Sequence, residues 1–351
     1  PEVAYRHDRR LVPCLEKVDW SQEPKQELPF KQNGMYLLSG GLGGIGVEIA
    51  KYLLQNYNAR LLLVGRTFLP DKSEWEVILQ QGNVVAERIE AYRSLEQLGG
   101  EISYQAVDIC DRVGLQQVVE QAKSFWQCEL DGVIHLAGTA PERLLVEETR
   151  DSLAATLRPK VLGTWALHQL IKHQPNSVFI SFSTLASFFG GATIGAYAAA
   201  NSFLDSFSHY QRQHSLQSYC FAWGMWEAIG MSRDSQAKDI LRAKGYQAVT
   251  LKQGMHSLLV GLHHNCRHLL VGLDGSNRNI RRYIEPQLSR RVQTLSAYFT
   301  AQTDSVSPQI LVGDRFGTAI TPTFRQLKEM PLTATGEIDR AQLVAMSRPG
   351  A

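Results

Sequence analysis

MYLLSGGLGGIG, at residues 35–46, is a short apolar run that leads directly into a glycine-rich turn. The apolar residues predict a buried strand, and Val47 to Asn56 predicts the helix that follows it. Gly40 permits a tight turn, Gly44 lets the backbone approach phosphate oxygens, and Gly46 lets the helix pack closely on the strand. A helix N-terminus attracts anions, so the stretch predicts a dinucleotide pyrophosphate site, with a bare strand-to-helix turn as the alternative. The residues expected to line this site are Gly40, Gly41, Leu42, Gly43, Gly44, Ile45 and Gly46.

The same alternation of short apolar runs with amphipathic helical stretches continues along the chain. It implies crossover units in which each strand is followed by a helix, and therefore an α/β fold with a doubly wound parallel sheet. The candidate strands are Met35–Ser39, Arg60–Gly65, Ile102–Val107, Gly132–His135, Val178–Phe182, Ser218–Ala222 and His268–Gly272.

The connection from Pro70 to Gly99 is longer than one crossover helix requires. Its residues follow a helical pattern that is broken at Gly82 and Asn83. The sequence leaves two roles open for this segment, packing within the fold and a face for a partner.

The composition is that of an ordinary globular protein, with 351 residues of which 44% are hydrophobic and 20% charged. The net charge of +2 favours no polyanionic partner, so we expect no nucleic-acid binding. No apolar run is long enough to predict a membrane span, and no export signal precedes the fold, which favours a cytoplasmic location. Because the chain begins at Pro1 without a methionine and ends in SRPGA, we expect a segment of a longer polypeptide.

Cysteine and histidine usage gives no support for a metal site or a disulfide framework. The five cysteines are scattered singly without CxxC spacing, and the ten histidines form no metal-ligand pattern. We therefore expect reduced cysteines that serve in packing, and no metal.

Residues at the ends of the second and third strands indicate which dinucleotide would bind. Arg66 stands where an acidic residue would usually hold a ribose diol, which suggests a 2'-phosphate and hence NADP; a solvated surface arginine is the alternative. Asp108 and Ile109 follow the third strand and would border the adenine. Alternatively, Asp108 caps the next helix, expected at Asp111 to Lys123.

After the fourth strand the chain reads HLAG, with Ala137 and Gly138 at the turn. A small residue followed by glycine lets the backbone pass beneath the ribose and nicotinamide of a cofactor. Taken alone, the same residues form a simple turn at a strand end.

A chemical signal lies in GAYAAANSF, which places Tyr197 and Asn201 one helical turn apart on the same face of a helix. This helix follows a strand end rich in hydroxyl groups, with Ser181, Ser183 and Thr184. An isolated tyrosine on an apolar helix is more often a core residue.

Four motifs in order, SGGLGGIG, HLAG, RPKVLGTW and YAAAN, make the chain resemble the short-chain dehydrogenase/reductase superfamily. Within it, the chain resembles the ketoreductase domains of modular polyketide and nonribosomal peptide synthetases. The resemblance covers roughly Val3 to Glu285. It implies a Rossmann-type sheet, an NADPH cofactor and a phosphopantetheine thioester, bound to a carrier protein, as the substrate.

The resemblance also assigns roles to individual residues. Tyr197 would donate its phenolic proton to the substrate oxygen while NADPH delivers hydride. Lys160 would bring the pKa of Tyr197 closer to neutral and contact the nicotinamide ribose. Asn201 would hold the geometry of the proton relay. Thr184 would hydrogen-bond the substrate carbonyl, with Ser183 as the substitute if the register differs by one residue.

Two further features of the family bear on substrate handling. The polar stretch Ser232 to Lys244 reads as a lid helix over substrate and cofactor. The family often reads stereochemistry from a Leu-Asp-Asp triplet or a tryptophan, but here Ala140, Pro141, Glu142 and Phe189 stand at those places. The configuration of the alcohol therefore stays unassigned.

The segment LKEMPLTATGEIDRAQL, residues 327–343, resembles the closing motif of adenylation domains. Glu337 stands where that family has its adenylating lysine, and a carboxylate there would repel phosphate, so we expect an inactive tail. The sequence thus predicts three parts. They are an amino-terminal strand segment at 1–33, an NADPH-binding ketoreductase domain at 34–290 and an adenylation-like appendage at 291–351.

A ketoreductase beside adenylation sequence resembles depsipeptide synthetases, which implies an α-ketoacyl thioester as substrate and neighbouring synthetase domains as partners. A β-ketoacyl thioester in a polyketide module is the alternative, favoured by the opening EVAYRHDRRLVPCLE, which would supply strands completing the reductase. A scaffold without catalysis and a stand-alone alcohol dehydrogenase are two further hypotheses.

Overall fold

The computed structural model describes residues 3–7, 9–174, 176–227, 241–284, 296–300, 323–334 and 336–346. The chain divides into two units, Pro1–Ile284 and Glu285–Ala351. The predicted lid at 232–244 lies mostly outside the described residues.

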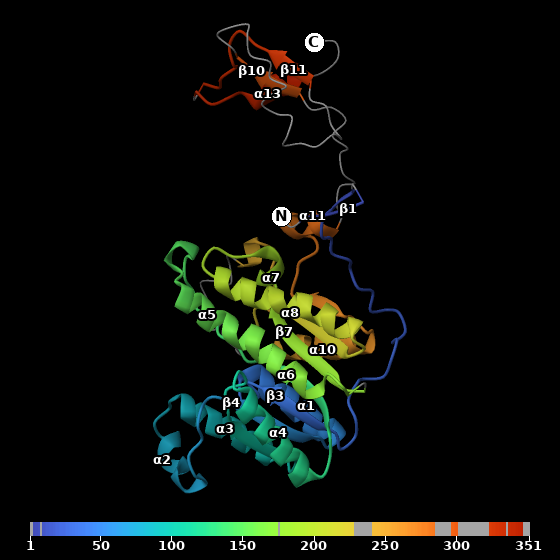
Figure 1. The fold of residues 1–351 in the computed structure, drawn as a ribbon, viewed down its shortest axis with the longest axis vertical. Coiled ribbons are helices and arrows are strands. Elements are labelled where there is room, and N and C mark those ends of the chain that lie inside the picture. Colours follow the sequence, from blue (N-terminus) through green and yellow to red (C-terminus); the bar gives the residue numbers. More distant parts are fainter. Residues whose placement is uncertain are drawn as a thin grey trace. The chain divides into compact units, whose positions relative to one another are not determined.

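A sheet of seven parallel strands forms the centre of the first unit (Figure 1). Its spatial order is β5-β4-β3-β6-β7-β8-β9, so the chain runs outward from β3 in one direction and then, from β6, in the other. The predicted doubly wound sheet is confirmed, and strand ends differ from the predicted ones by at most two residues. The strands are β3 (Met35–Ser39), β4 (Arg60–Gly65), β5 (Glu101–Ala106), β6 (Leu130–His135), β7 (Val178–Thr184), β8 (Gln217–Trp223) and β9 (His268–Val271).

Helices cover both faces of this sheet (Figure 1). Among the described residues of the first unit, the helices are α1 (Gly44–Tyr57), α2 (Trp75–Leu79), α3 (Val84–Glu96), α4 (Arg112–Trp126), α5 (Arg150–Arg158), α6 (Thr164–Ile171), α7 (Ala186–Phe189), α8 (Gly195–Gln213), α10 (Leu251–His263) and α11 (Arg278–Ile284). Short helical turns are η1 (Lys72–Glu74), η2 (Leu145–Glu147) and the π-helical η3 (Pro159–Gly163).

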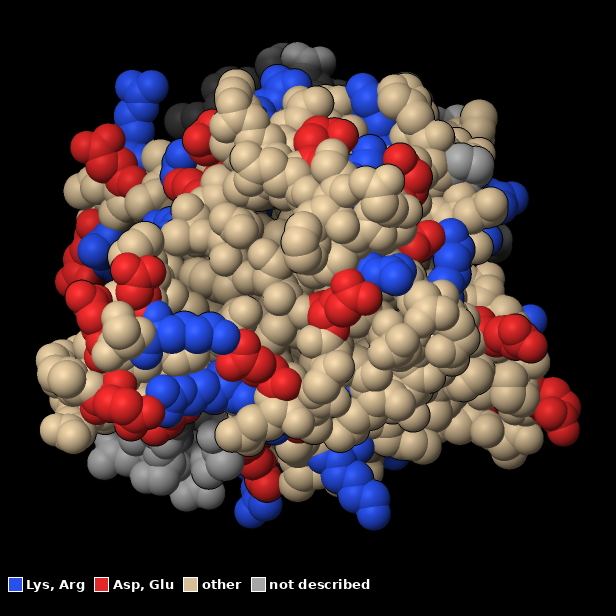
Figure 2. All heavy atoms as spheres, turned by 90° about the horizontal axis from the view of Figure 1, so that it is seen from below, with Lys and Arg blue, Asp and Glu red and all other residues tan. Residues whose placement is uncertain are grey.

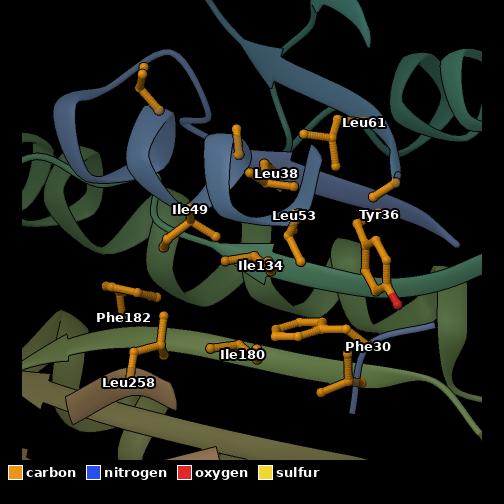
Figure 3. Close-up of a cluster of buried hydrophobic side chains, with 14 of the residues drawn as sticks. Phe30, Tyr36, Leu38, Ile49, Leu53, Leu61, Ile134, Ile180, Phe182 and Leu258 are labelled. Atoms are coloured by element: carbon orange, nitrogen blue, oxygen red, sulfur yellow. The ribbon is translucent and has the colours of Figure 1, made fainter. Parts of the chain in front are cut away.

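Side chains of β3 alternate between two buried cores. Tyr36 and Leu38 join the core beneath α1 and α10, shown in Figure 3, while Met35 and Leu37 join the core beneath α4 and α6. All five residues of β3 are buried, as expected for a central strand with helices on both faces.

The glycine-rich turn forms as its sequence predicts. Gly40 has a φ of +73°, which only glycine adopts without strain. A Cβ atom at Gly46 would lie 2.7 Å from the carbonyl oxygen of Gly40, so any side chain there would push α1 off the strand end. The predicted helix after this turn is confirmed as α1.

The long connection between β4 and β5 folds into η1, α2 and α3. The predicted break lies at Gly82, with a φ of +59°, and at Asn83, whose side chain caps α3 by accepting from Val85 N and Ala86 N. The helix α3 packs on α1 and β5 and buries Ala86, Ile89 and Leu95. Packing is therefore one role of this segment.

The amino-terminal segment differs from the expectation that it completes the reductase sheet. The strands β1 (Ala4–Arg6) and β2 (Arg9–Leu11) pair antiparallel with each other and form their own sheet among the described residues. Further along, Gln26 Nε2 donates to Tyr219 Oη at 2.7 Å. This part of the segment thus lies along the surface of the first unit.

The second unit contains a parallel pair, β10 (Ser296–Phe299) with β11 (Thr323–Gln326), and the helix α13 (Arg340–Met346). Tyr298 Oη donates to the carbonyl oxygen of Leu343 at 2.9 Å, which ties the pair to the helix. The pair and the helix give the described part of this unit mixed α and β structure.

Charged side chains of both signs are mixed on the face shown in Figure 2, around a large uncharged area. Among the described helices, none combines the length and the apolar character that a bilayer span requires.

The core beneath α1 generates a stability prediction. Leu53 is fully buried between α1 and the sheet, so Leu53→Ala should leave a cavity and lower the free energy of unfolding by about 2–5 kcal/mol. Urea denaturation followed by circular dichroism measures this loss. Val77→Ala on α2 is the control, since Val77 is 64% exposed and its loss should change stability by less than about 0.5 kcal/mol.

Candidate active site

A cavity of about 320 Å³ opens at the carboxyl ends of β4, β3 and β6, beside the glycine-rich turn. This is the edge at which ligands bind to sheets of this topology. Eight of the predicted cofactor residues line it together: Gly40, Leu42, Gly43, Arg66, Asp108, Ile109, Ala137 and Gly138. The other predicted cofactor residues, Gly41, Gly44, Ile45, Gly46, Lys160 and Tyr197, are outside its lining.

The walls of the cavity lack side chains where the backbone comes closest. A Cβ atom at Gly40 would lie 3.1 Å from Ala137 N, and one at Gly41 would lie 2.8 Å from Leu63 Cδ2. Gly43 is the N-cap residue of α1 and offers no side chain to the helix N-terminus. Backbone N–H groups at that end therefore suit an anion, and the cavity fits the pyrophosphate of a dinucleotide.

Asp108 pairs with a residue that the sequence did not point to. Its carboxylate forms an ion pair with Arg158 and accepts a hydrogen bond from Cys110 N at 2.9 Å. Burial alone would raise the pKa of Asp108, but these two partners together lower it. The N-cap of α4 is Asp111, which accepts from Gly114 N at 3.1 Å, so the alternative that Asp108 caps this helix is wrong.

Arg88 is a second lining residue that sequence reasoning missed. It lies on α3, lines the cavity and donates from Nη1 to the carbonyl oxygen of Leu42 in the glycine-rich turn. No spacing in the sequence reveals this contact, because it depends on how α3 lies against the turn.

Tyr197 lies in the first turn of α8, next to the end of β7. Burial raises its pKa, and the nearby side chains of Thr184 and Asn201 oppose that rise. Asn201 is fully buried, and its Nδ2 donates to the carbonyl oxygen of Tyr197 at 2.8 Å. Its Oδ1 has no hydrogen-bond partner among the described residues.

The two hydroxyl residues at the end of β7 point to different neighbours. Thr184 is close enough to the Tyr197 phenol to oppose the rise in its pKa, whereas the Ser183 hydroxyl donates to the backbone oxygen of Asn201 at 3.4 Å. Side chains of consecutive strand residues point to opposite faces, which explains the difference. Thr184 is therefore the hydroxyl that accompanies the tyrosine.

Lys160 lies in the π-helical turn η3 and is buried, with 4% of its surface exposed. Its Nζ donates to the carbonyl oxygen of Phe182 at 2.9 Å, and its stem fills the space above Gly138, where a Cβ would lie 2.7 Å from Lys160 Cε. Burial lowers the pKa of Lys160 to about 8, although the charges of Cys220 and Asp205 oppose this fall.

The structure differs from the expected effect of Lys160 on Tyr197. The pKa of Tyr197 is raised by burial rather than brought toward neutral, and the groups that oppose the rise are Thr184 and Asn201. The Lys160 ammonium is instead directed to the β7 backbone.

A polar cluster contains Asp205, Cys220 and His268. The sequence did not predict it, because the cysteines and histidines are scattered along the chain without metal-ligand spacing. The ligand-type atoms of the cluster lie within 4.8 Å of one another, with Cys220 Sγ and His268 Nε2 at 3.3 and 3.4 Å from Asp205 Oδ1. Burial alone would raise the pKa of Asp205, but His268 lowers it, so the carboxylate is charged. This negative charge opposes the fall in the pKa of Lys160.

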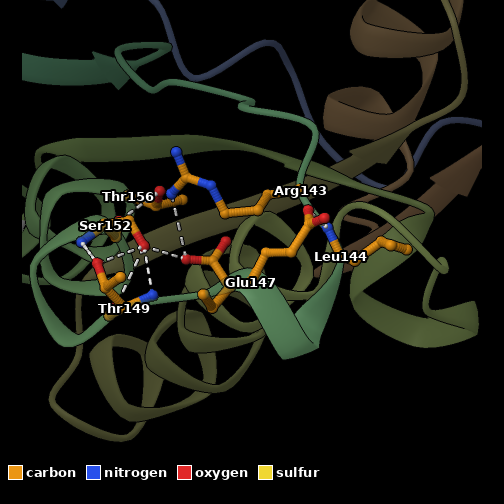
Figure 4. A network of polar contacts seen from close by, with 7 residues as sticks. Arg143, Leu144, Glu147, Thr149, Ser152 and Thr156 are labelled. Atoms are coloured by element: carbon orange, nitrogen blue, oxygen red, sulfur yellow. Dashed lines mark hydrogen bonds and ion pairs between the residues drawn. The ribbon is translucent and has the colours of Figure 1, made fainter.

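The loop after β6 carries Ala140, Pro141 and Glu142 in place of the family's Leu-Asp-Asp triplet and is tied to the segment just before α8. Arg143 N donates to the carbonyl oxygen of Thr193 at 2.7 Å. Figure 4 shows the polar network that continues from there, in which Arg143 pairs with Glu148 at 3.6 Å.

The same network includes the hydrogen bond from Thr149 N to Ser152 Oγ at 2.9 Å (Figure 4). Phe189, which stands where the resembling family often has a tryptophan, lies in α7 and packs on Tyr246 and Tyr283, with ring centroids 5.5 and 5.4 Å apart.

The sequence matches one family model, described as KR domain, over residues 34–228. Among curated proteins, a 6-methylsalicylic acid synthase of Arthrobotrys oligospora is 31% identical over 239 residues, which are 68% of this chain and 13% of the synthase. A phenolphthiocerol/phthiocerol polyketide synthase of Mycobacterium tuberculosis is 30% identical over 226 residues, 64% of this chain and 12% of that one. The chain thus spans a small part of each synthase.

Among solved structures, the chain is similar to an adenylation, ketoreductase and pseudo Asub multidomain structure of a keto acid-selecting NRPS module. The TM-score is 0.72 and the identity 29%, covering 98% of this chain and 29% of that one. It is also similar to a ketoreductase domain from the bacillaene assembly line. There the TM-score is 0.68 and the identity 25%, covering 80% of this chain and 64% of the other.

The burial of Lys160 generates a prediction about stability and pH. Its pKa falls from 10.5 to about 8 on folding, which costs the folded state about 3 kcal/mol below pH 8. The cost disappears as the pH approaches 10.5, because the unfolded state then loses the same proton. Lys160→Met should therefore be more stable than the natural chain at pH 7, by a margin that shrinks above pH 8.

Urea denaturation of both proteins from pH 7 to 10.5 measures this margin. Groups that do not interact with Lys160 titrate equally in the two proteins and cancel in the difference. A margin that is constant over this range would show that folding does not change the pKa of Lys160.

Proposed function

Since the chain belongs to the ketoreductase (KR) domain family, whose members are oxidoreductases that act on a ketone, we propose that it reduces a ketoacyl thioester on a carrier protein with NADPH. The product would be the hydroxyacyl thioester. The observation that supports this most directly is Tyr197, a partly buried residue that lies beside Thr184 and accepts a hydrogen bond from Asn201 Nδ2 on its backbone oxygen.

The nicotinamide cofactor, when bound, supplies hydride to the carbonyl carbon. The phenol of Tyr197 donates its proton to the carbonyl oxygen, and its raised pKa means that the proton is present at neutral pH. The Thr184 hydroxyl donates a hydrogen bond to the same oxygen and stabilises the negative charge that develops on it. Asn201 orients Tyr197 through the hydrogen bond to its backbone oxygen.

Lys160 has two roles in this proposal. Its stem packs behind Gly138, which lines the cofactor cavity, and so supports that part of the wall. Its ammonium, held on the Phe182 carbonyl oxygen, would contact the nicotinamide ribose when the cofactor is bound and would help to replace the proton that Tyr197 gives up. A pKa of about 8 keeps most of this ammonium charged at neutral pH while letting it exchange a proton.

Preference for NADPH over NADH rests on Arg66. This residue follows β4 and lines the cavity at the place where an acidic side chain would select a ribose diol. A guanidinium there suits a 2'-phosphate, which it can bind in a bidentate manner. Asp108 and Ile109, on the same wall, would border the adenine.

An α-ketoacyl group is the substrate we favour. The keto acid-selecting NRPS module is similar to this chain over 98% of this chain's length. The bacillaene ketoreductase domain is similar over 80% of it, so the likeness to the NRPS module extends further. A β-ketoacyl group is the second candidate, favoured by the polyketide synthases among the relatives. Adjacent synthetase domains and a carrier protein would be the partners in either case.

Residues 291–351 would form an appendage without adenylation activity, which follows in the chain the short segment at 1–33 and the reductase domain at 34–290. The resembling NRPS module carries a region described as a pseudo Asub. Glu337 is exposed at the place of the expected lysine, and its carboxylate would repel the phosphate of an acyl-adenylate.

Turnover with matched thioesters tests this function. The purified chain is mixed with NADPH and either an α-ketoacyl or a β-ketoacyl pantetheine thioester, and the loss of reduced-nicotinamide absorbance is followed. We expect the α-keto substrate to have the higher kcat/KM, and Tyr197→Phe to reduce turnover at least about 100-fold because no proton is donated.

A preference for the β-keto substrate would place the chain in polyketide extension. Saturable NADPH binding without turnover of either thioester would contradict the reductase function and favour a scaffold. Oxidation of a free alcohol at a comparable rate would favour a stand-alone dehydrogenase.

The two hydroxyl residues of β7 should differ in their effect on turnover. Thr184→Val keeps the shape of the side chain but removes the donor beside Tyr197, so kcat should fall about 100-fold, and Thr184→Ser should restore most of it. Ser183→Ala is the matched control and should have a much smaller effect, because Ser183 bonds backbone instead. The reverse order of effects would assign the donor to Ser183.

A further inference from the structure

We propose that Arg88 is a second ligand of the cofactor 2'-phosphate, so that Arg66 and Arg88 hold this group between β4 and α3. This inference rests on the proposed NADPH dependence and adds a residue that determines cofactor specificity. It also assigns a function to the long connection between β4 and β5.

The first argument is the position of the Arg88 guanidinium beside the glycine-rich turn. Its Nη1 donates to the carbonyl oxygen of Leu42, and it lies 3.8 Å from the place where a Cβ of Gly43 would be. The guanidinium therefore occupies the space that a side chain at position 43 would enter. It has five N–H donors, so one bond to Leu42 leaves others for an anion.

The second argument is the balance of charge around the cavity. Three arginines and one carboxylate, Asp108, are among its lining residues. Arg158 is paired with Asp108. Within the described ranges, Arg66 and Arg88 lie within ion-pair distance of no carboxylate, so the cavity has two uncompensated positive charges. A phosphate dianion would balance them.

The third argument is that both arginines lie at the same end of the cavity. Thr67 follows Arg66, and its carbonyl oxygen accepts a hydrogen bond from Tyr104 Oη at 2.6 Å. Arg88 is close enough to Tyr104 to oppose the rise in its pKa that burial causes. Tyr104 therefore lies between the Arg66 segment and Arg88, and all four residues line the cavity.

The fourth argument is that α3 holds Arg88 firmly. The helix is capped by Asn83 and buries Ile89 and Leu95 on the face that packs against the unit. A side chain held on a capped and packed helix loses less entropy on binding than one on a loop. The extra length of the connection is thus needed to bring a helix, and its arginine, over the turn.

The test measures cofactor affinity rather than activity. Dissociation constants for NADPH and NADH are measured by the fluorescence of the reduced nicotinamide, with 2',5'-ADP and ADP as competitors. For Arg88→Ala we expect the NADPH dissociation constant to rise about tenfold or more, with little change for NADH. The advantage of 2',5'-ADP over ADP should fall by a similar factor.

Two further variants make the measurement specific. Arg93→Ala is the matched control, because Arg93 lies on the same helix but pairs with Glu76 at 2.7 Å outside the cavity; it should change neither affinity. Arg88→Lys retains the charge and should recover part of the NADPH affinity. If Arg88→Ala unfolds the helix, the dissociation constants of Arg88→Lys still test the role of this side chain.

Three outcomes would overturn the inference. If Arg88→Ala weakens NADPH and NADH equally, Arg88 only orders the turn through Leu42. If Arg66→Ala removes the preference for NADPH and Arg88→Ala leaves it intact, Arg66 acts alone and the proposed function stands. If the natural chain does not prefer NADPH, the proposed cofactor fails as well as the role of Arg88.

Discussion

The close contact between α1 and the end of β3 is the constraint on which the rest of the structure depends. Gly46 lets the helix approach to within van der Waals contact of the Gly40 carbonyl. That approach aims the helix N-terminus at the cavity and places Ile49 and Leu53 in the core beneath it. The absence of a side chain at Gly46 therefore matters for packing and for the cavity, because the same turn positions the helix and keeps the cavity open.

The fold was predictable because its signals are local. Each strand is a short apolar run, and the turn at 40–46 has the glycines that its geometry requires, so sequence and structure agree to within two residues at the strand ends. The break at Gly82 and Asn83 was visible for the same reason, since a cap residue and a positive φ act on neighbouring backbone. The pairing of β1 with β2 was not visible, because exposed strands have no apolar pattern to read.

The candidate site was predictable only in part, because some of its contacts join distant segments. Thr184 and Tyr197 were found from the order of motifs, but which of the two hydroxyl residues faces the phenol depends on the register of β7. Arg88 and Arg158 were missed, since nothing near them in the sequence indicates that they reach the cavity. The polar environment of Lys160, with Asp205 and Cys220, likewise arises from three separate elements.

The hydrogen bond from Arg143 to Thr193 joins the loop after β6 to the residue two before α8. Loop and helix are therefore mechanically coupled, and a force on one is transmitted to the other. An engineer who exchanges this loop for that of a relative would also break or shift the bond to the segment that leads into the helix carrying Tyr197. Grafts that include both partners of the bond, residues 140–148 together with 190–194, would preserve the register of the two segments.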